Sequence, residues 1–133
     1  MVEKLNAARS TTRTCGSTSF PATTPVNWSE RLAQAAEGHS AYMANNNVFS
    51  HTGLGGSTVG TRIQSTGYAY TTAGENIAAE QPNVDSVIND WLASPGHCAN
   101  IMNPAFKEYG FACVFNSTST YQRYWTQVFA APR

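Results

Sequence analysis

The sequence contains little charge, few cysteines and no long apolar run. Lys, Arg, Asp and Glu make up 12% of the 133 residues, and the formal net charge at pH 7 is zero. The eight basic residues are scattered, so they form no basic patch of the kind that binds nucleic acid or an anionic membrane surface. No apolar stretch approaches the roughly 20 residues of a membrane-spanning helix. We therefore expect no nucleic-acid partner and no membrane span.

The length and the N-terminal residues set further limits. A chain of 133 residues can bury one core, so we expect a single domain over residues 1–133. We also expect a monomer. The first residues include no basic segment followed by an apolar core, which a secretion signal would have. We expect a soluble protein, with any secretion signal absent from this sequence.

The three cysteines, at positions 15, 98 and 113, fit either one disulfide and a spare thiol or three buried thiols. We favour the disulfide. Cys98 and Cys113 flank a segment that ends in a strand-like run, so we expect these two to pair. Cys15 would then be free or paired outside this chain.

Four stretches have the apolar spacing of amphipathic helices, with Asn27 (Glu30 three residues on), Ser57 and Asn83 as expected N-caps. The last is the clearest, because its apolar residues recur at intervals of three and four until Ser94, Pro95 and Gly96 end it. The Ser10–Pro25 segment has no periodicity and predicts a loop or an extended wrap. The four stretches are residues 1–10, 27–47, 57–68 and 83–96.

Two strand-like runs close the chain, at residues 109–115 and 121–130, with a turn-prone segment between them. Helices first and antiparallel strands last indicate an α+β domain in which helices cover a small antiparallel sheet. His39 shares the apolar face of the second helix with Leu32, Ala36 and Met43. We interpret His39 as a hydrogen-bonded core residue rather than a metal ligand.

Five motifs, in register over nearly the whole chain, resemble the bacterial branch of the CAP superfamily. That superfamily comprises the cysteine-rich secretory proteins, antigen 5 and the pathogenesis-related 1 proteins. The resemblance implies a three-layer α-β-α sandwich, a secreted or cell-surface location, and a cleft of histidines and acidic residues that binds a divalent metal in some members. The motifs are FSHTG (49–53), GENIA (74–78), WLASPGHCANIMNP (91–104), YGFAC (109–113) and YWTQVFA (124–130).

The resemblance assigns the cleft to His51, Glu75 and His97, with Ser94 where eukaryotic members usually have a second glutamate. Two neutral imidazoles can bind zinc or a similar divalent ion, and Glu75 can orient a histidine or hold a metal-bound water. A catalytic zinc normally has three protein ligands, so we expect weak binding by His51 and His97. The alternative is that the three side chains form a buried hydrogen-bond network that only fixes loops.

Three functions remain open. The first is a secreted binding module that takes a metal and an extracellular ligand, whether lipid, glycan or protein. The second is a metal-assisted hydrolase of peptide or cell-wall material, with Glu75 as the candidate catalytic residue. The third is a purely structural extracellular domain. Ser94, His97 and Glu75 are the residue types of a nucleophilic triad, but the sequence has no G-x-S-x-G elbow. We favour the binding module because the family positions supply neither a second general base nor a third metal ligand.

Overall fold

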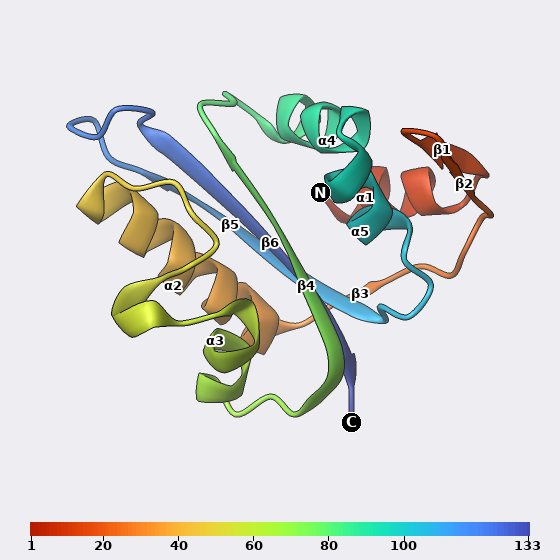
Figure 1. Cartoon of the computed structure of the whole chain (residues 1–133), viewed down its shortest axis with the longest axis horizontal. Coiled ribbons are helices and arrows are strands. Elements are labelled where there is room, and N and C mark those ends of the chain that lie inside the picture. Colours follow the sequence, from red (N-terminus) through yellow and green to blue (C-terminus); the bar gives the residue numbers. More distant parts are fainter.

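A four-stranded sheet with helices on both faces forms the body of the protein, as a computed structural model of all residues 1–133 shows (Figure 1). The helices are α1 (Val2–Arg9), α2 (Glu30–Asn46), α3 (Val59–Ser65), α4 (Val84–Ala93) and α5 (Pro95–Met102), with a short 3-10 helix η1 (Leu54–Gly56). The strands are β1 (Arg13–Cys15), β2 (Thr18–Phe20), β3 (Asn27–Trp28), β4 (Tyr70–Ala79), β5 (Glu108–Phe115) and β6 (Arg123–Pro132). The predicted α+β class and the α-β-α sandwich are confirmed.

The sheet has the order β3-β5-β6-β4, while β1 and β2 form a separate hairpin. Strands β5 and β4 both run antiparallel to β6, and the short β3 pairs in parallel with β5. Helices α2 and α3 cover one face, and α1, α4 and α5 lie on the other (Figure 1). Because β4 is last in the strand order, it is an edge strand. It lies between the two helical layers. None of the helices has the length and hydropathy to span a membrane.

Each helical layer buries the apolar face that the sequence predicts. In α4, Val87, Ile88 and Trp91 are buried, and the Trp91 indole donates a hydrogen bond of 3.0 Å to the carbonyl of Ile77. In α2 the predicted face is also buried, and its His39 is 1% exposed. The predictions of a buried face for these two helices are confirmed.

The first turns of α2 and α3 differ from the prediction. Ser29, not Asn27, caps α2, because Asn27 and Trp28 pair with β5 and the Ser29 hydroxyl accepts from the Leu32 amide. Thr58, not Ser57, caps α3 and forms a capping box with Thr61. Asn83 caps α4 as predicted.

Several elements were not predicted from the sequence, among them α5 and β4. Ser94 ends α4 but also precedes α5, and Pro95 occupies the first turn of α5, where its missing N–H costs no hydrogen bond. Strand β4 was not recognised because Glu75 and Asn76 interrupt its apolar pattern, although both are buried. The Ser10–Pro25 segment also contains the β1–β2 hairpin.

The predicted Cys98–Cys113 disulfide is wrong: the bridge joins Cys15 to Cys98, with Cα atoms 5.5 Å apart, and Cys113 is free and exposed. Helix α5 explains the difference. It turns Cys98 into the core beneath α1 and α4, where Cys15 is also buried. Cys113 lies instead near the end of β5 and remains exposed. The bridge therefore ties the β1–β2 hairpin to α5.

Candidate functional site

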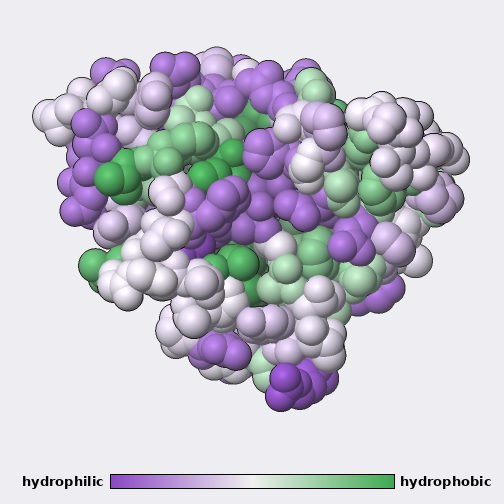
Figure 2. All heavy atoms as spheres, viewed as in Figure 1, coloured by the Kyte–Doolittle hydropathy of each residue, from purple (hydrophilic) through white to green (hydrophobic).

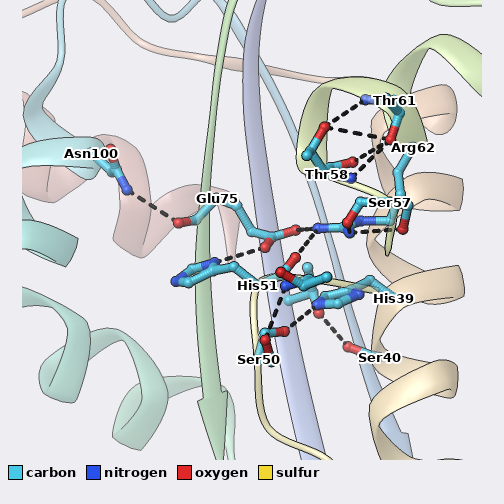
Figure 3. Close-up of polar contacts among 12 residues, drawn as sticks. His39, Ser40, Ser50, His51, Ser57, Thr58, Thr61, Arg62, Glu75 and Asn100 are labelled. Atoms are coloured by element: carbon cyan, nitrogen blue, oxygen red, sulfur yellow. Dashed lines mark hydrogen bonds and ion pairs between the residues drawn. The ribbon is translucent and has the colours of Figure 1, made fainter. Parts of the chain in front are cut away.

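Glu75 is at the centre of a polar cluster beside the edge strand (Figure 3). Its side chain is 2% exposed. One carboxylate oxygen, Oε1, lies 2.8 Å from His51 Nδ1, and the other, Oε2, accepts a hydrogen bond of 2.7 Å from Arg62 Nη2. Both oxygens of this buried carboxylate are therefore engaged, one by an imidazole and one by a guanidinium.

Arg62, on α3, fixes both the carboxylate and the loop that carries His51. Its Nη2 also donates to the carbonyl of His51 (3.0 Å), and its Nη1 donates to the carbonyl and hydroxyl of Ser57 (3.0 and 3.1 Å). Arg62 was not among the site residues predicted from the sequence. The available signal was weak: Arg62 is the one charged residue in a helix otherwise built of neutral residues.

One ring nitrogen of His51 is hydrogen-bonded, and the other is free. An ionised carboxylate can only accept, so Nδ1 carries the proton that is donated to Glu75, and Nε2 keeps its lone pair. The Nε2 atom has no hydrogen bond within the protein, and the side chain is 60% exposed. The arrangement leaves Nε2 available to an external ligand.

Gly53, the last residue of the FSHTG motif, allows the surrounding side chains to approach closely. A Cβ atom at this position would lie 2.7 Å from Ser57 Oγ, 2.9 Å from Arg62 Nη1 and 3.0 Å from His39 Nδ1. These distances are shorter than real Cβ contacts, so a larger residue would displace Arg62 or the His51 loop. The glycine is needed here for space.

His97, on α5, lies on the other side of β4. Its carbonyl accepts a hydrogen bond of 3.2 Å from Asn76, whose side-chain oxygen in turn accepts one of 2.9 Å from Asn100. Burial lowers the pKa of His97 below the ordinary histidine value, and the charge that His51 carries when protonated lowers it further. Both effects favour the neutral imidazole, which is the form that binds metals.

A groove of about 330 Å³ opens beside His97. On the molecular face seen in Figure 2, hydrophilic residues gather across the middle with apolar residues on either side. Most of the groove lining is hydrophobic, and it includes Phe49, Ile77, Trp91, Ser94, His97 and Tyr121.

The candidate triad is not assembled. Glu75 contacts His51 and Arg62 rather than His97, and the Ser94 hydroxyl makes no hydrogen bond. Ser94 and His97 do line the same groove. No nucleophile, base and orienting carboxylate are therefore joined in the way that the triad mechanism needs.

A divalent metal in this cleft would have at most the two imidazoles of His51 and His97 as histidine ligands. No group of three or more His, Cys, Asp and Glu side chains lies close enough together to hold an ion. Glu75 is buried and each of its oxygens takes part in one hydrogen bond, and its hydrogen bond to His51 is of the kind that orients metal-binding histidines. His51 and His97 would hold the ion, and water or a bound ligand would fill the remaining positions.

Comparison with known proteins identifies the family. The model of the cysteine-rich secretory protein family, CAP, matches residues 2–129. The chain belongs to the CAP family. Over 105 residues this CAP domain is 34% identical to the uncharacterized protein YkwD of Bacillus subtilis, a match that covers 79% of the chain and 39% of YkwD.

Solved structures agree with the family assignment. An extracellular protein containing an SCP domain from Bacillus anthracis is 33% identical, with a TM-score of 0.72, and the match covers 82% of this chain and 34% of that protein. An outer surface protein of Borrelia burgdorferi has a TM-score of 0.75 at 20% identity, over 84% of this chain and 80% of that one. The similarity to the Borrelia protein shows a shared fold and nothing more. The chain spans little more than a third of the length of the two Bacillus proteins.

Proposed function

We propose that this CAP domain works outside the cell as a binding module that holds a divalent metal, such as Zn²⁺, between His51 and His97. The observation that carries the proposal is the hydrogen bond between His51 Nδ1 and the buried Glu75 carboxylate. This contact sets the tautomer of His51 and leaves Nε2 as a free ligand atom, as in the carboxylate–histidine–zinc arrangements of metalloproteins. The lowered pKa of His97 supports the same reading.

Two protein ligands imply weak binding. Zinc prefers four ligands, so water or a group of the bound partner must complete the coordination. The mainly apolar groove beside His97 is a suitable place for such a partner, because His97 lines it together with the aromatic side chains of Phe49, Trp91 and Tyr121. The metal would then help to hold an extracellular ligand rather than drive a reaction.

Several observations favour a binding role rather than hydrolysis. Others favour a location outside the cell. Glu75 is held by His51 and Arg62 and is not free to act as a general base, so we expect no robust peptidase or glycosidase turnover. Turnover that disappears in Glu75→Gln, with the fold retained, would instead support the hydrolase. The Cys15–Cys98 disulfide suits an oxidising compartment, and a related protein is described as extracellular.

Zinc titration by calorimetry tests the metal site. The parent protein should bind one equivalent weakly at about pH 7.5 and more weakly at about pH 6, because protonated imidazoles cannot bind metal. His51→Ala and His97→Ala should each lose at least about tenfold in affinity. His39→Gln is the matched control, since it changes the remaining histidine, which bonds the Ser50 carbonyl instead. If both site variants bind zinc as tightly as the parent does, the two histidines are not zinc ligands. His51, Glu75 and His97 would then serve only as a structural hydrogen-bond network.

A further inference from the structure

The four-stranded sheet has two outer edges, and only one of them is covered. At the β4 edge, the outward carbonyls of Glu75 and Ile77 accept hydrogen bonds from the side chains of Asn100 and Trp91. At the opposite edge, the two-residue β3 leaves Gly110–Phe115 of β5 without a partner strand on that side (Figure 1). Helices α4 and α5 therefore close the β4 edge, whereas most of the β5 edge is open.

Alternate residues of the open segment point their backbone groups away from the sheet. The carbonyl of Tyr109 accepts a hydrogen bond from the Ser29 amide, so the backbone groups of Tyr109 point away from β6. Strand geometry repeats every two residues, so the N–H and C=O groups of Phe111, Cys113 and Phe115 point the same way. No loop or neighbouring strand gives these groups a hydrogen bond. Another strand could therefore add to the sheet here.

The open segment lacks the features that usually protect a sheet edge, which are charged residues, proline and bulges. The sequence over residues 111–115 is FACVF, with no charge and no proline, and its pairing with β6 has no bulge. Cys113 is exposed, Phe115 is 56% exposed, and Ala112 and Val114 are partly exposed. This apolar edge is therefore a template for pairing with another strand.

The edge is complementary to itself when two copies run antiparallel. With Cys113 of one copy opposite Cys113 of the second copy, Phe111 of each copy lies opposite Phe115 of the other. Aromatic side chains directly opposite one another stabilise antiparallel pairs. The outward N–H and C=O groups of the two Cys113 residues then bond to each other, as in the hydrogen-bonded pairs of antiparallel ladders.

The charges at the two ends of the edge are complementary in the same arrangement. At one end, the Arg123 guanidinium lies 5.2 Å from the centre of the Phe115 ring. At the other end, Glu30 accepts a hydrogen bond of 3.0 Å from Trp28, whose ring packs edge-on against Phe111. Neither Arg123 nor Glu30 has an ion-pair partner within the chain. Antiparallel pairing brings the basic end of each copy to the acidic end of the other.

We propose that this CAP domain forms a symmetric dimer in which two β5 strands pair antiparallel through residues 111–115. The pairing joins two four-stranded sheets into one. It uses the edge opposite β4, so the dimer and the proposed metal site can fail independently. A contact of five residues per strand is small for a protein interface, so the dimer is weak and in equilibrium with the monomer expected from the sequence.

Sedimentation equilibrium of the parent protein up to about 1 mM tests the dimer. The mean mass should rise with concentration from that of one chain towards that of two. Over the same range, hydrogen exchange measured by NMR should slow at the amides of Phe111, Cys113 and Phe115. A protein that stays monomeric, or slowed exchange only elsewhere, would overturn the proposal.

A synthetic alternating Thr-Val peptide is the comparison for another partner. It should slow the exchange of these amides no more than a second copy does. If the peptide slows them while the protein alone remains monomeric, the edge binds a strand of a different protein and the dimer is wrong.

Two substitutions at the exposed Cys113 separate the edge from the fold. Cys113→Ser keeps the edge neutral and should dimerise like the parent. Cys113→Lys places two like charges opposite each other and should weaken the dimer at least about tenfold. Both should fold, because the side chain is exposed. The proposal is overturned if Cys113→Lys dimerises as tightly as Cys113→Ser.

Charge reversal tests the antiparallel orientation. Arg123→Glu and Glu30→Arg should each weaken the dimer about threefold, because each places like charges at both ends of the interface. The double variant Glu30→Arg/Arg123→Glu restores opposite charges and should regain the affinity of the parent. A double variant that dimerises more weakly than either single variant would contradict the antiparallel arrangement.

Discussion

The two faces of the edge strand β4 hold their polar side chains in different ways. On the α2–α3 side, Glu75 pairs with the charged Arg62 and is hydrogen-bonded to His51. On the α4–α5 side, Asn76 is bound through neutral amides, by Asn100 and Gln127. That side also carries the disulfide, which anchors α5 next to His97.

The difference shows how one strand can position two histidines with unequal freedom. His51 is exposed and depends on its hydrogen bond to Glu75 for its orientation, whereas His97 belongs to a helix fixed by a covalent bond and by buried amides. A shared metal would therefore meet one rigid ligand and one adaptable ligand.

Loss of the Cys15–Cys98 disulfide should have the largest effect. The bridge joins residues 83 positions apart, and the chain-entropy estimate for a loop of that size is about 4.5 kcal/mol. Denaturant unfolding of a Cys15→Ala/Cys98→Ala variant measures the loss. Cys113→Ala is the control and should change stability by less than about 0.5 kcal/mol, because Cys113 is free and exposed. A large effect of Cys113→Ala would favour the Cys98–Cys113 bridge instead.

Arg62→Met should destabilise the protein by about 3 kcal/mol, because it leaves the buried Glu75 carboxylate without its cation. The double variant Arg62→Met/Glu75→Leu removes both charges and should regain most of that stability while binding less zinc than the parent. Denaturant unfolding and zinc titration of both variants give the comparison. If the double variant is no more stable than Arg62→Met, packing around Arg62 matters more than its charge.

Asn76→Ala should cost about 2 kcal/mol, because it removes a buried amide and leaves Gln127 and the His97 carbonyl short of a hydrogen bond. The effect should be smaller than that of Arg62→Met, since no charge loses its partner. Denaturant unfolding of the two variants under one set of conditions ranks them. If Asn76→Ala is more destabilising than Arg62→Met, the neutral amide contacts contribute more to the stability of β4 than the charged contacts do.

Acidification should have the smallest effect. Burial lowers the pKa of both His39 and His97 in the folded protein. The unfolded chain therefore takes up protons first, so stability is full above roughly pH 6.5 and falls as the pH drops below it. Thermal unfolding should show a lower midpoint at about pH 5 than at about pH 7, with a shallower decline in His39→Gln. A midpoint that rises on acidification would contradict the pKa directions.

The sequence predicted the parts of the fold that follow a regular apolar pattern and missed those where a polar residue is buried. Helix α4 and strand β6 are clear from their apolar residues, whereas β4 is hidden by Glu75 and Asn76. The disulfide was assigned wrongly because Ser94-Pro95-Gly96 was interpreted only as a helix end. Without helix α5, nothing in the sequence indicates that Cys98 faces Cys15.

The candidate site was predicted in its residue types but not in its contacts. The resemblance supplied His51, Glu75 and His97, and the structure brings His51 and Glu75 into contact. The role of Arg62 could not be predicted, because it depends on how α3 packs beside β4 and not on any local pattern.

The central claim is that His51 and His97 bind one metal ion across the edge strand. A crystal structure of the protein soaked with zinc, with anomalous diffraction recorded at the zinc edge, tests it most directly. The account predicts a single peak about 2.0–2.1 Å from Nε2 of His51 and from a ring nitrogen of His97, with water or a ligand group completing the coordination. A peak at only one of the two histidines, or none at either, would contradict it.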